Sequence, residues 1–394
     1  MVQYVAIFLE MHQPRRISGK AFQKLVDLLS LEHISEETLI ENIFDEDADR
    51  ETILRIVENS YRPVLDIVLS EEMKISLSIS GILLELLKKH NPEVINILGN
   101  ISKQGLIEFL CEPYYHSLAM FAGEDVVLEE LKLSRENIKN MFGVEPRVVF
   151  NTEGLYNDQF ASTLERIGFK AVVTEGVERV LGWRSPTFLY STLNGKTRIL
   201  LRHGMLSEDV ALRFGDMGWC CYPLTADKYA RWMKGTPGEF VIIGLDVETF
   251  GEYFSKETGI LEFLKWLPRE LRNNGLELIH TSEIIEYFDP VDELMFETTV
   301  SWTNGRDESA WLGNEMQKLA FTDLINLKRI FKESGCLRLW HMFLTSDYFY
   351  YMSNKPCREG MGQHRFDPYK NPYKAFKHFI ETLKVATLVL QTHL

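Results

Sequence analysis

The sequence predicts an α/β fold: a parallel sheet with helical crossovers, closed or nearly closed as a barrel, followed by a C-terminal α-helical bundle. Up to residue 290, short apolar runs alternate with longer segments of helical period, which is typical of repeated βα units. After Pro290 the apolar residues follow the helical period alone. We therefore expect a barrel domain over residues 1–290 and a helical domain over residues 291–394.

The candidate strands are seven short apolar runs. Strands of a parallel sheet are covered by helices on both faces, so a nearly continuous apolar run is the expected signal. The runs cover residues 4–9, 74–80, 106–111, 147–151, 170–174, 240–245 and 276–280. Between them, residues 124–141 and 257–271 place their apolar side chains on one helical face, as crossover helices do.

Two insertions interrupt this alternation. Residues 31–70 are mostly helical in period and contain an acidic run at residues 45–49, and residues 183–235 contain a hairpin at residues 188–202 followed by loops. Beyond residue 290, helical period covers residues 310–332, 337–352 and 371–390. The apolar stripes of these last segments are expected to pack as a core.

The composition excludes several classes of protein. The 394 residues carry a net charge of -14, from 43 basic and 57 acidic side chains, which disfavours nucleic acid and anionic membranes as partners. No basic leader precedes the first run, and no apolar run approaches the ~18 residues that a membrane span needs. Cys111, Cys220, Cys221, Cys336 and Cys357 show no CxxC spacing, which argues against a zinc site or a disulfide framework. We expect a cytoplasmic protein that needs no metal or cofactor.

Acidic and histidine side chains follow the predicted strands at their carboxyl ends. His12 and Gln13 follow the first run, Glu108 lies on the third with His116 just beyond it, Glu153 ends the fourth, and Asp246 and Glu248 end the sixth. Because the carboxyl ends of parallel strands meet at one rim, we expect these side chains to converge there. Taken singly, such an acid is more often a helix cap or a solvated loop charge than a site residue, and a single histidine is more often a core residue. Convergence on one rim favours a functional site.

Two carboxyl groups on one rim predict glycoside hydrolysis. One group acts as an ionised nucleophile, while the other stays protonated and donates to the leaving oxygen. Glu153 and Asp246 are the chosen pair, and Asp246 leaves a buried strand, where a side chain is held rigidly and is only partly solvated. His12 and His116 are suited to hydrogen bonding with sugar hydroxyls, and aromatic side chains offer flat faces to pyranose rings.

Five segments in order resemble the motif regions of glycoside hydrolase family 57, the family of α-amylases and 4-α-glucanotransferases. They are HQP at residues 12–14, GLIE at 105–108 with YHSL at 115–118, FNTE at 150–153, LDVETFGE at 245–252 and TSDYFYYM at 345–352. Similar text also lies within residues 174–186 and 301–314, so the resemblance spans nearly the whole chain. It implies an incomplete barrel of seven strands with a helical C-terminal region, and a retaining mechanism.

Position by position, the resemblance implies that Glu153 is the nucleophile and Asp246 the general acid and base. His12, Glu108, His116 and Asp347 fall where the family places substrate-contacting or supporting residues. Further candidates for substrate binding are Gln13, Trp183, Asp209, Glu248, Phe250 and Trp302. The candidate walls of an acceptor site, which are equally suited to packing, are Trp183, Trp219, Phe250, Tyr253 and residues 348–351. Tyr348 stands where the similar subgroup usually has a histidine, a departure that bears on the substrate and not on the catalytic pair.

The predicted protein is a retaining enzyme of the α-amylase type, with an α-glucan or a maltooligosaccharide as its partner. A 4-α-glucanotransferase shares this chemistry and is the first alternative. A non-catalytic glucan-binding protein would lack Glu153 or Asp246, and both are present. A metal-dependent carbohydrate deacetylase would need a His-x-x-x-His cluster with aspartates, which this sequence lacks.

Overall fold

The central strand of the structure is β1 (Tyr4–Met11), whose residues after Tyr4 are all buried. It pairs in parallel with β2 (Ile75–Ile79) and with β8 (Phe240–Asp246). Because both faces of these strands are covered, β1 and β8 carry apolar side chains in nearly unbroken runs. The acids Glu10 and Asp246 appear only where the two strands reach their carboxyl ends.

The computed structural model describes residues 1–31, 33–303, 305–355 and 365–392, so Cys357 lies outside the described residues. The other strands are β3 (Ile107–Leu110), β4 (Val148–Phe150), β5 (Ala171–Glu175), β6 (Tyr190–Ser191), β7 (Arg198–Arg202), β9 (Glu277–Ile279) and β10 (Asp292–Glu293). One sheet has the order β3-β2-β1-β8, with β9 paired to the start of β1, and the other has the order β10-β6-β7-β5-β4.

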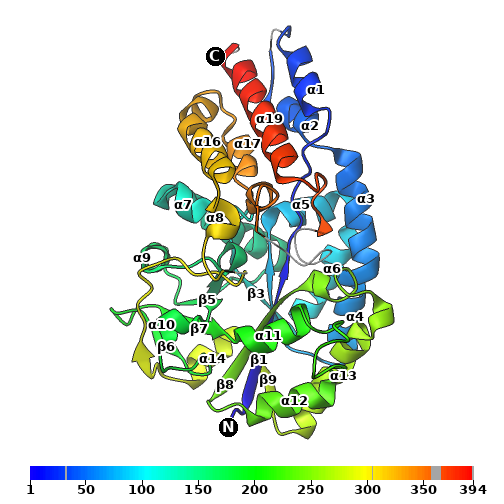
Figure 1. The fold of residues 1–394 in the computed structure, drawn as a ribbon, viewed down its shortest axis with the longest axis vertical. Helices are drawn as coiled ribbons and strands as arrows, with labels where there is room; N and C mark the ends of the chain where they lie inside the picture. Colours follow the sequence, from blue (N-terminus) through cyan, green and yellow to red (C-terminus); the bar gives the residue numbers. More distant parts are fainter. Residues whose placement is uncertain (32, 304, 356–364, 393–394) are drawn as a thin grey trace.

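The two sheets together form an incomplete barrel (Figure 1). Backbone hydrogen bonds join them at two edges, for example from Cys111 N to Val148 O at 2.9 Å and from His203 N to Ile242 O at 2.8 Å. The predicted α/β barrel fold is confirmed. All seven predicted strands are present, as β1 to β5, β8 and β9.

The predicted hairpin at residues 188–202 also forms, because β6 and β7 pair antiparallel. Its assignment to an insertion is wrong for β7, which pairs in parallel with β5 and lies within the barrel. The sequence RILLR of β7 has arginine at both ends, and it pairs antiparallel with β6 just before it in the chain. Its local pattern is therefore that of a hairpin and does not reveal the parallel pairing with β5.

Helices surround the strands (Figure 1). Up to β8 they are α1 (Ala21–Leu28), α2 (Glu36–Ile43), α3 (Glu46–Ile56), α4 (Arg62–Ser70), α5 (Gly81–His90), α6 (Pro92–Lys103), α7 (Ala119–Ala122), α8 (Glu124–Phe142), α9 (Asp158–Arg166), α10 (Glu178–Leu181), α11 (Gly204–Ala211) and α12 (Ala226–Gly235). After β8 they are α13 (Ile260–Asn273), α14 (Thr281–Tyr287), α15 (Ser309–Leu312), α16 (Glu315–Glu333), α17 (Leu337–Phe343), α18 (Ser346–Tyr350) and α19 (Pro372–Thr392). The insertion at residues 31–70 is helical, as predicted.

Two of the predicted C-terminal helices are each divided in the structure. Residues 310–332 contain α15 and α16, because Asn314 and Gln317 form a capping box that begins a new helix. Residues 337–352 contain α17 and α18, separated at Leu344 and Thr345. Thr345 pairs with Ser117 in an isolated bridge, and this contact brings the start of α18 to the barrel loop after β3.

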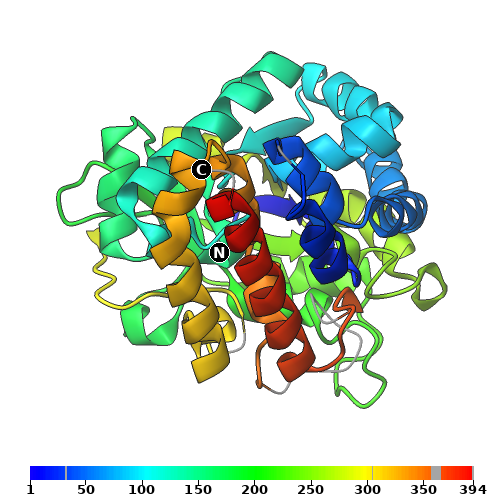
Figure 2. The same cartoon turned by 90° about the horizontal axis from the view of Figure 1, so that it is seen from above.

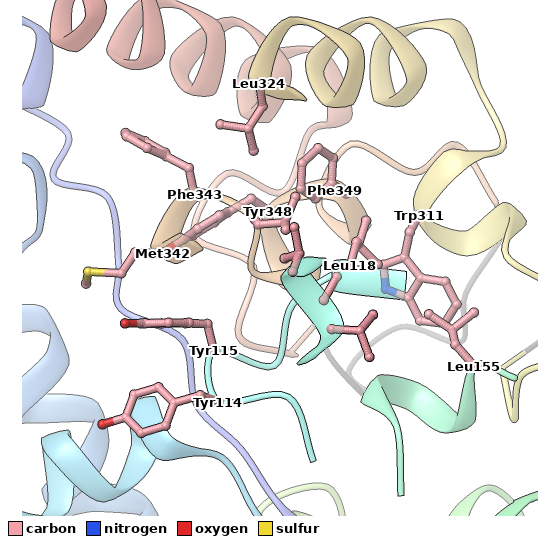
Figure 3. Packing of buried hydrophobic residues seen from close by; sticks show 14 of the residues in the cluster. Tyr114, Tyr115, Leu118, Leu155, Trp311, Leu324, Met342, Phe343, Tyr348 and Phe349 are labelled. Carbon is pink, nitrogen blue, oxygen red and sulfur yellow. The ribbon is translucent and has the colours of Figure 1, made fainter. Parts of the chain in front are cut away.

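The C-terminal helices lie over the carboxyl ends of the barrel strands (Figure 1; Figure 2). One buried apolar cluster contains residues of both parts, and Figure 3 shows Tyr348 and Phe349 of α18 packed in it near Leu118. The rim of the barrel is therefore covered by a second part of the chain. The division into two domains at residue 290 stays a prediction. Among the described residues, every helix is too short or too polar to span a membrane.

Candidate active site

Glu153 lies directly after β4, in the short turn η2 (Thr152–Gly154). Its residue is 6% exposed, and its backbone φ is +56°, in the left-handed region that L-residues rarely adopt. Its Oε2 accepts a hydrogen bond from Trp302 Nε1 at 2.7 Å, and its Oε1 lies 3.5 Å from His116 Nε2. The turn and the two nitrogen neighbours hold this carboxyl group in one orientation, which a nucleophile requires.

Trp302 is itself fixed by packing. Its ring is stacked on Phe8, with the ring centroids 6.0 Å apart and the planes at 9°, and Arg202 Cζ lies 5.4 Å from the Trp302 ring. Arg202 ends β7 and donates a hydrogen bond from Nη1 to Glu175 Oε2, at the end of β5, at 2.6 Å. The ends of two neighbouring strands therefore position the hydrogen-bond donor to Glu153.

His116 has a left-handed backbone as well, with φ at +50°. Its carbonyl oxygen accepts a hydrogen bond from Ser346 N at 3.0 Å, and its Nδ1 lies 3.6 Å from Glu10 Oε1 and 3.7 Å from Glu112 Oε2. Burial opposes the charged imidazole, but attraction to Glu10 and the contacts with Glu112 and Glu153 outweigh burial and raise the pKa of His116 well above its ordinary value. An imidazolium therefore faces Glu153.

Asp246 is the last residue of β8, so the strand aims its side chain at the rim. Burial and then the charge of Glu153 raise the pKa of Asp246 from 3.8 to about 7, although Arg202, His116 and a hydrogen bond from Tyr253 favour the ionised form. A carboxyl group with such a pKa can donate a proton at neutral pH and accept one again later. The two carboxyl groups of the predicted pair thus have unequal environments.

His12 links the barrel to the C-terminal helices. Its Nε2 donates to Asp347 Oδ2 at 2.9 Å, and its Nδ1 lies 2.7 Å from Ser80 Oγ. Its ring is stacked on that of His116, with centroids 3.8 Å apart. Burial and the neighbouring His116 charge lower the pKa of His12 to about 4. His12 is therefore neutral beside the charged ring, with its proton on Nε2 toward Asp347.

Glu248 and Gln13 form a second polar group on the rim. Gln13 Nε2 donates to Glu248 Oε1 at 3.2 Å, and Tyr61, from the helical insertion, donates to the same oxygen at 2.5 Å. Burial and then the charge of Asp246 raise the pKa of Glu248 to about 8. The structure thus brings together Glu153, Asp246, His12, Gln13, His116, Glu248, Trp302 and Asp347.

The prediction that Glu108 lines this rim is wrong. Glu108 is the second residue of β3, and its Oε2 accepts hydrogen bonds from Ser76 Oγ at 2.8 Å, Thr281 Oγ1 at 3.0 Å and Ser282 N at 3.2 Å. These partners belong to β2 and to the first turn of α14. A carboxylate beside the first N–H groups of a helix is stabilised by them, so Glu108 joins strands to a helix in the amino half of the barrel.

Trp183 and Asp209 each contact an arginine, and Phe250 lies in an apolar core, so substrate binding by Trp183 and Asp209 stays a prediction. Trp183 is 87% exposed, and its ring packs against the guanidinium of its neighbour Arg184. Asp209 Oδ1 accepts a hydrogen bond from Arg213 Nε at 2.7 Å within the same helical segment. Phe250 is 1% exposed and packs in an apolar core, so it offers no face to a sugar.

The structure adds Glu10, Glu112 and Tyr61 to the site, which the sequence analysis missed. Glu10 is the single charged residue in the strand sequence YVAIFLEM, and an acid in such a run is the signal that could have found it. Glu112 is fully buried and accepts a hydrogen bond from Ser78 Oγ at 2.8 Å. Tyr61 lies in a helical insertion, and no sequence pattern ties that insertion to the rim.

Glu10, His116 and Glu153 offer one possible metal ligand each, and these atoms lie within 4.8 Å of one another. In its protonated form the His116 imidazole has no lone pair to give to a metal ion. His116 is flanked by carboxyl groups that favour this protonated form. The cluster therefore fits proton sharing among acids and one imidazole.

The model of Glycosyl hydrolase family 57 matches residues 6–297. The chain belongs to glycosyl hydrolase family 57. The predicted family is confirmed, and this family-57 protein is a glycoside hydrolase. The matched range includes both predicted catalytic carboxyl groups, and Asp347 of α18 lies beyond it.

Relatives of this family-57 chain include a Methanocaldococcus jannaschii protein with a provisional alpha-amylase name. It is 35% identical over 394 residues, covering 95% of this chain and 82% of that protein. An alpha-amylase of Pyrococcus horikoshii is 32% identical over 31% of this chain and 19% of its own length. A 4-alpha-glucanotransferase of Thermococcus kodakarensis is 31% identical over 30% of this chain and 18% of its own length.

Solved structures of family-57 enzymes share the fold. A branching enzyme of Thermococcus kodakaraensis superposes with a TM-score of 0.67 at 12% identity, covering 100% of this chain and 94% of that one. The alpha-amylase AmyC of Thermotoga maritima superposes with a TM-score of 0.61 at 12% identity, covering 100% of this chain and 96% of that one. This family-57 chain therefore shares its overall fold with both structures along its whole length.

The departure at Tyr348 lies outside the group of catalytic carboxyls. The Tyr348 hydroxyl donates to the carbonyl oxygen of Arg15 at 2.6 Å, and its ring packs near Phe379 of α19. Tyr348 therefore fastens the segment after β1 to the last helix. In this family-57 chain the substitution contributes to packing behind Asp347.

Proposed function

We propose that this glycoside hydrolase cleaves α-1,4-glucosidic bonds in α-glucans or maltooligosaccharides by double displacement, with Glu153 as nucleophile and Asp246 as general acid and base. The observation that carries the proposal is the difference between the environments of the Glu153 and Asp246 carboxyl groups. Glu153 accepts a hydrogen bond from Trp302 Nε1 and faces the His116 imidazolium, while the pKa of Asp246 is raised to about 7. The names of the relatives support the α-glucan substrate.

In the first step, a Glu153 oxygen attacks the anomeric carbon as the bond from that carbon to the leaving oxygen breaks. The Asp246 proton passes to the leaving oxygen, so the departing sugar leaves as a neutral alcohol. In the second step, Asp246 takes a proton from water as the water oxygen attacks the anomeric carbon and frees Glu153. Two inversions give net retention, and Asp246 ends protonated as it began.

His116 and Trp302 act on the nucleophile in both steps. Each directs a nitrogen-bound hydrogen toward a different oxygen of Glu153, at 3.5 Å and 2.7 Å respectively. These donors hold the carboxylate in place for attack and receive it again when the covalent intermediate is hydrolysed.

A second candidate function is 4-α-glucanotransfer, because a relative with that name matches nearly a third of the chain. Transfer differs only in what attacks the intermediate on Glu153. A sugar acceptor wins over water if binding surfaces hold its hydroxyl in line. Tyr253 lies beside Asp246, where such a surface would be needed. We propose that hydrolysis dominates, in keeping with the relative that matches along most of this chain.

Incubation with maltotriose tests both proposals. Chromatography from early times should show growth of reducing ends with products no longer than the substrate. A ladder of longer oligosaccharides with almost no rise in reducing ends would make the transferase assignment correct. Proton NMR of the first product should show the α-anomer before mutarotation, and a β-anomer would contradict retention. In a crystal structure, the Glu153 and Asp246 carboxyl groups should lie about 5–5.5 Å apart.

We also propose a cytoplasmic location. The four described cysteines are free thiols, and the adjacent Cys220 and Cys221 keep their sulfur atoms 3.7 Å apart without a disulfide. Unpaired, partly exposed thiols are typical of a reducing compartment. Fractionation of the native cells should recover the protein with cytosolic markers, and recovery outside that fraction would contradict the proposal.

A further inference from the structure

Glu10 is a buried acid to which the proposed mechanism gives no task. It is 3% exposed and lies beside Asp246 in the register of β1 and β8. Its Oε1 is buried and makes no hydrogen bond within the described part of the chain. The nearest cation atom, His116 Nδ1, is 3.6 Å away, whereas a charge-assisted hydrogen bond is about 2.7–2.9 Å long. This oxygen is therefore an ion-pair neighbour of His116 that has no hydrogen bond of its own among the described residues.

The charges around Glu10 favour its neutral form. Glu112, Glu153 and Asp246 all face it, against the single cation His116. Four ionised carboxylates around one imidazolium would leave uncompensated like charges in a buried space. Burial first, and then these three acids, raise the pKa of Glu10 well above its ordinary value despite His116. Glu10 and Asp246 are thus the two acids of this group whose pKa values are raised.

The charges that face His116 from its other sides do not change this result. His12, stacked on the His116 ring, is neutral, and Asp347 lies beyond His12. Glu112 and Glu153 approach His116 from the ends of β3 and β4, at 3.7 Å and 3.5 Å. The imidazolium therefore has two acids besides Glu10 to balance it.

We propose that Glu10 is a substrate-binding residue that acts as a neutral carboxylic acid and donates a hydrogen bond to a hydroxyl of the sugar bound between Glu153 and Asp246. The inference rests on the proposed function, since it assumes a sugar in that position. A buried carboxyl oxygen without a hydrogen bond lowers stability, so a ligand that satisfies it accounts for its presence. A neutral group there also adds no negative charge beside the proton donor Asp246.

A matched pair of substitutions at this position tests the proposal. Glu10→Gln keeps a neutral donor and acceptor of the same size, while Glu10→Met keeps the length and removes both. We expect Glu10→Gln to stay within about threefold of the wild type in Kd and KM for maltotriose, and Glu10→Met to weaken both about 10- to 100-fold. Kd is measured by calorimetry in a Glu153→Gln background, and thermal unfolding checks that both variants fold.

Infrared spectroscopy tests the protonation state without any substrate. The difference spectrum between wild type and Glu10→Gln should contain the carbonyl stretch of a protonated carboxylic acid. A carboxylate band in its place would overturn the proposal and make Glu10 a charged partner of His116. A loss of maltotriose affinity in Glu10→Gln as large as that in Glu10→Met would overturn it in the same way. Loss of activity with a chelator, restored by a divalent cation, would also overturn it. A wild type inactive on maltotriose would contradict the proposed function, while the infrared band would still decide the state of Glu10.

Discussion

Glu108 and Glu112 lie four residues apart at β3, yet the two ends of the barrel use them differently. Glu108, in the amino half, has an oxygen that accepts three hydrogen bonds from β2 and α14. Glu112, at the carboxyl end, accepts one hydrogen bond from Ser78, and its Oε1 is buried with no hydrogen bond among the described residues. In the amino half, the acid is hydrogen-bonded and holds secondary-structure elements together. At the carboxyl end, carboxyl oxygens are left without hydrogen bonds among the described residues.

This contrast matches a division of labour along the strands. In barrels of parallel strands, the amino ends carry stability and the carboxyl ends carry catalysis. Here the open or shared carboxyl groups Glu10, Glu112, Glu153 and Asp246 gather at the carboxyl end around His116. Substitutions at the two ends should therefore separate activity from stability.

Glu153→Gln is expected to have the largest effect. It removes the nucleophile while keeping the shape of the side chain, so kcat on maltooligosaccharides should fall at least about 10³-fold with substrate binding largely kept. Steady-state kinetics and calorimetric binding measure the two parts. The same substitution at Glu108 is the control. Turnover of Glu153→Gln near the wild-type rate would remove Glu153 from the mechanism.

Asp246→Asn should lose less activity than Glu153→Gln, and the size of the loss should depend on the leaving group. Without the proton donor, kcat/KM on maltooligosaccharides should fall about 10²–10⁴-fold. An aryl glycoside whose leaving group needs no proton should lose less in the glycosylation step, measured as the burst of released phenol. Equal losses on both substrates would show that Asp246 does not donate the proton.

The pH dependence should report the same residue. Because general acid catalysis needs protonated Asp246, kcat/KM should fall about tenfold per pH unit above about 7, the pKa to which burial and Glu153 raise this group. The unfolded chain ionises this carboxyl near 3.8, so its contribution to folding becomes less favourable as pH rises from 3.8 to about 7. A basic limb that persists unchanged in Asp246→Asn would contradict this assignment.

Glu108→Gln should have the smallest effect on activity. It weakens the acceptor of three hydrogen bonds in the amino half, so the free energy of unfolding should fall by about 1–3 kcal/mol. The kcat/KM of the folded variant should stay within about twofold of the wild type, because Glu108 does not touch the carboxyl cluster. Urea unfolding and kinetics below the transition provide the two measurements. A large loss of kcat at unchanged stability would place Glu108 back in the site.

The sequence predicted those parts of the molecule that depend on local pattern. Apolar runs located the barrel strands, and the polar residues directly after them, such as His12, Glu153 and Asp246, do meet at one end of the barrel. The assignment of β7 to the barrel was not predicted, because its five residues, with an arginine at each end, have the local pattern of a hairpin with β6. The positions of His12, Glu153 and Asp246 at the rim were therefore predictable from strand ends alone.

The remaining errors come from contacts between distant residues. Glu108 had the residue type and motif of a site residue, but its partner Thr281 is 173 positions away, and only the three-dimensional register shows that the carboxylate is already occupied. Phe250 follows Asp246 closely, yet its ring turns into the core. Glu10 was missed because a single acid at the end of an apolar strand looks like an exposed strand terminus until its neighbours are known.

The bond between His12 and Asp347 joins residues 335 positions apart, and it has a consequence for how the enzyme is made. During translation, His12 leaves the ribosome 335 residues before Asp347. Until α18 has left the exit tunnel and docked, the nascent barrel holds His12 without its acid. We expect a translation product that stops before residue 347 to accumulate as an inactive chain. Only copies of the protein that contain Asp347 should then contribute to turnover.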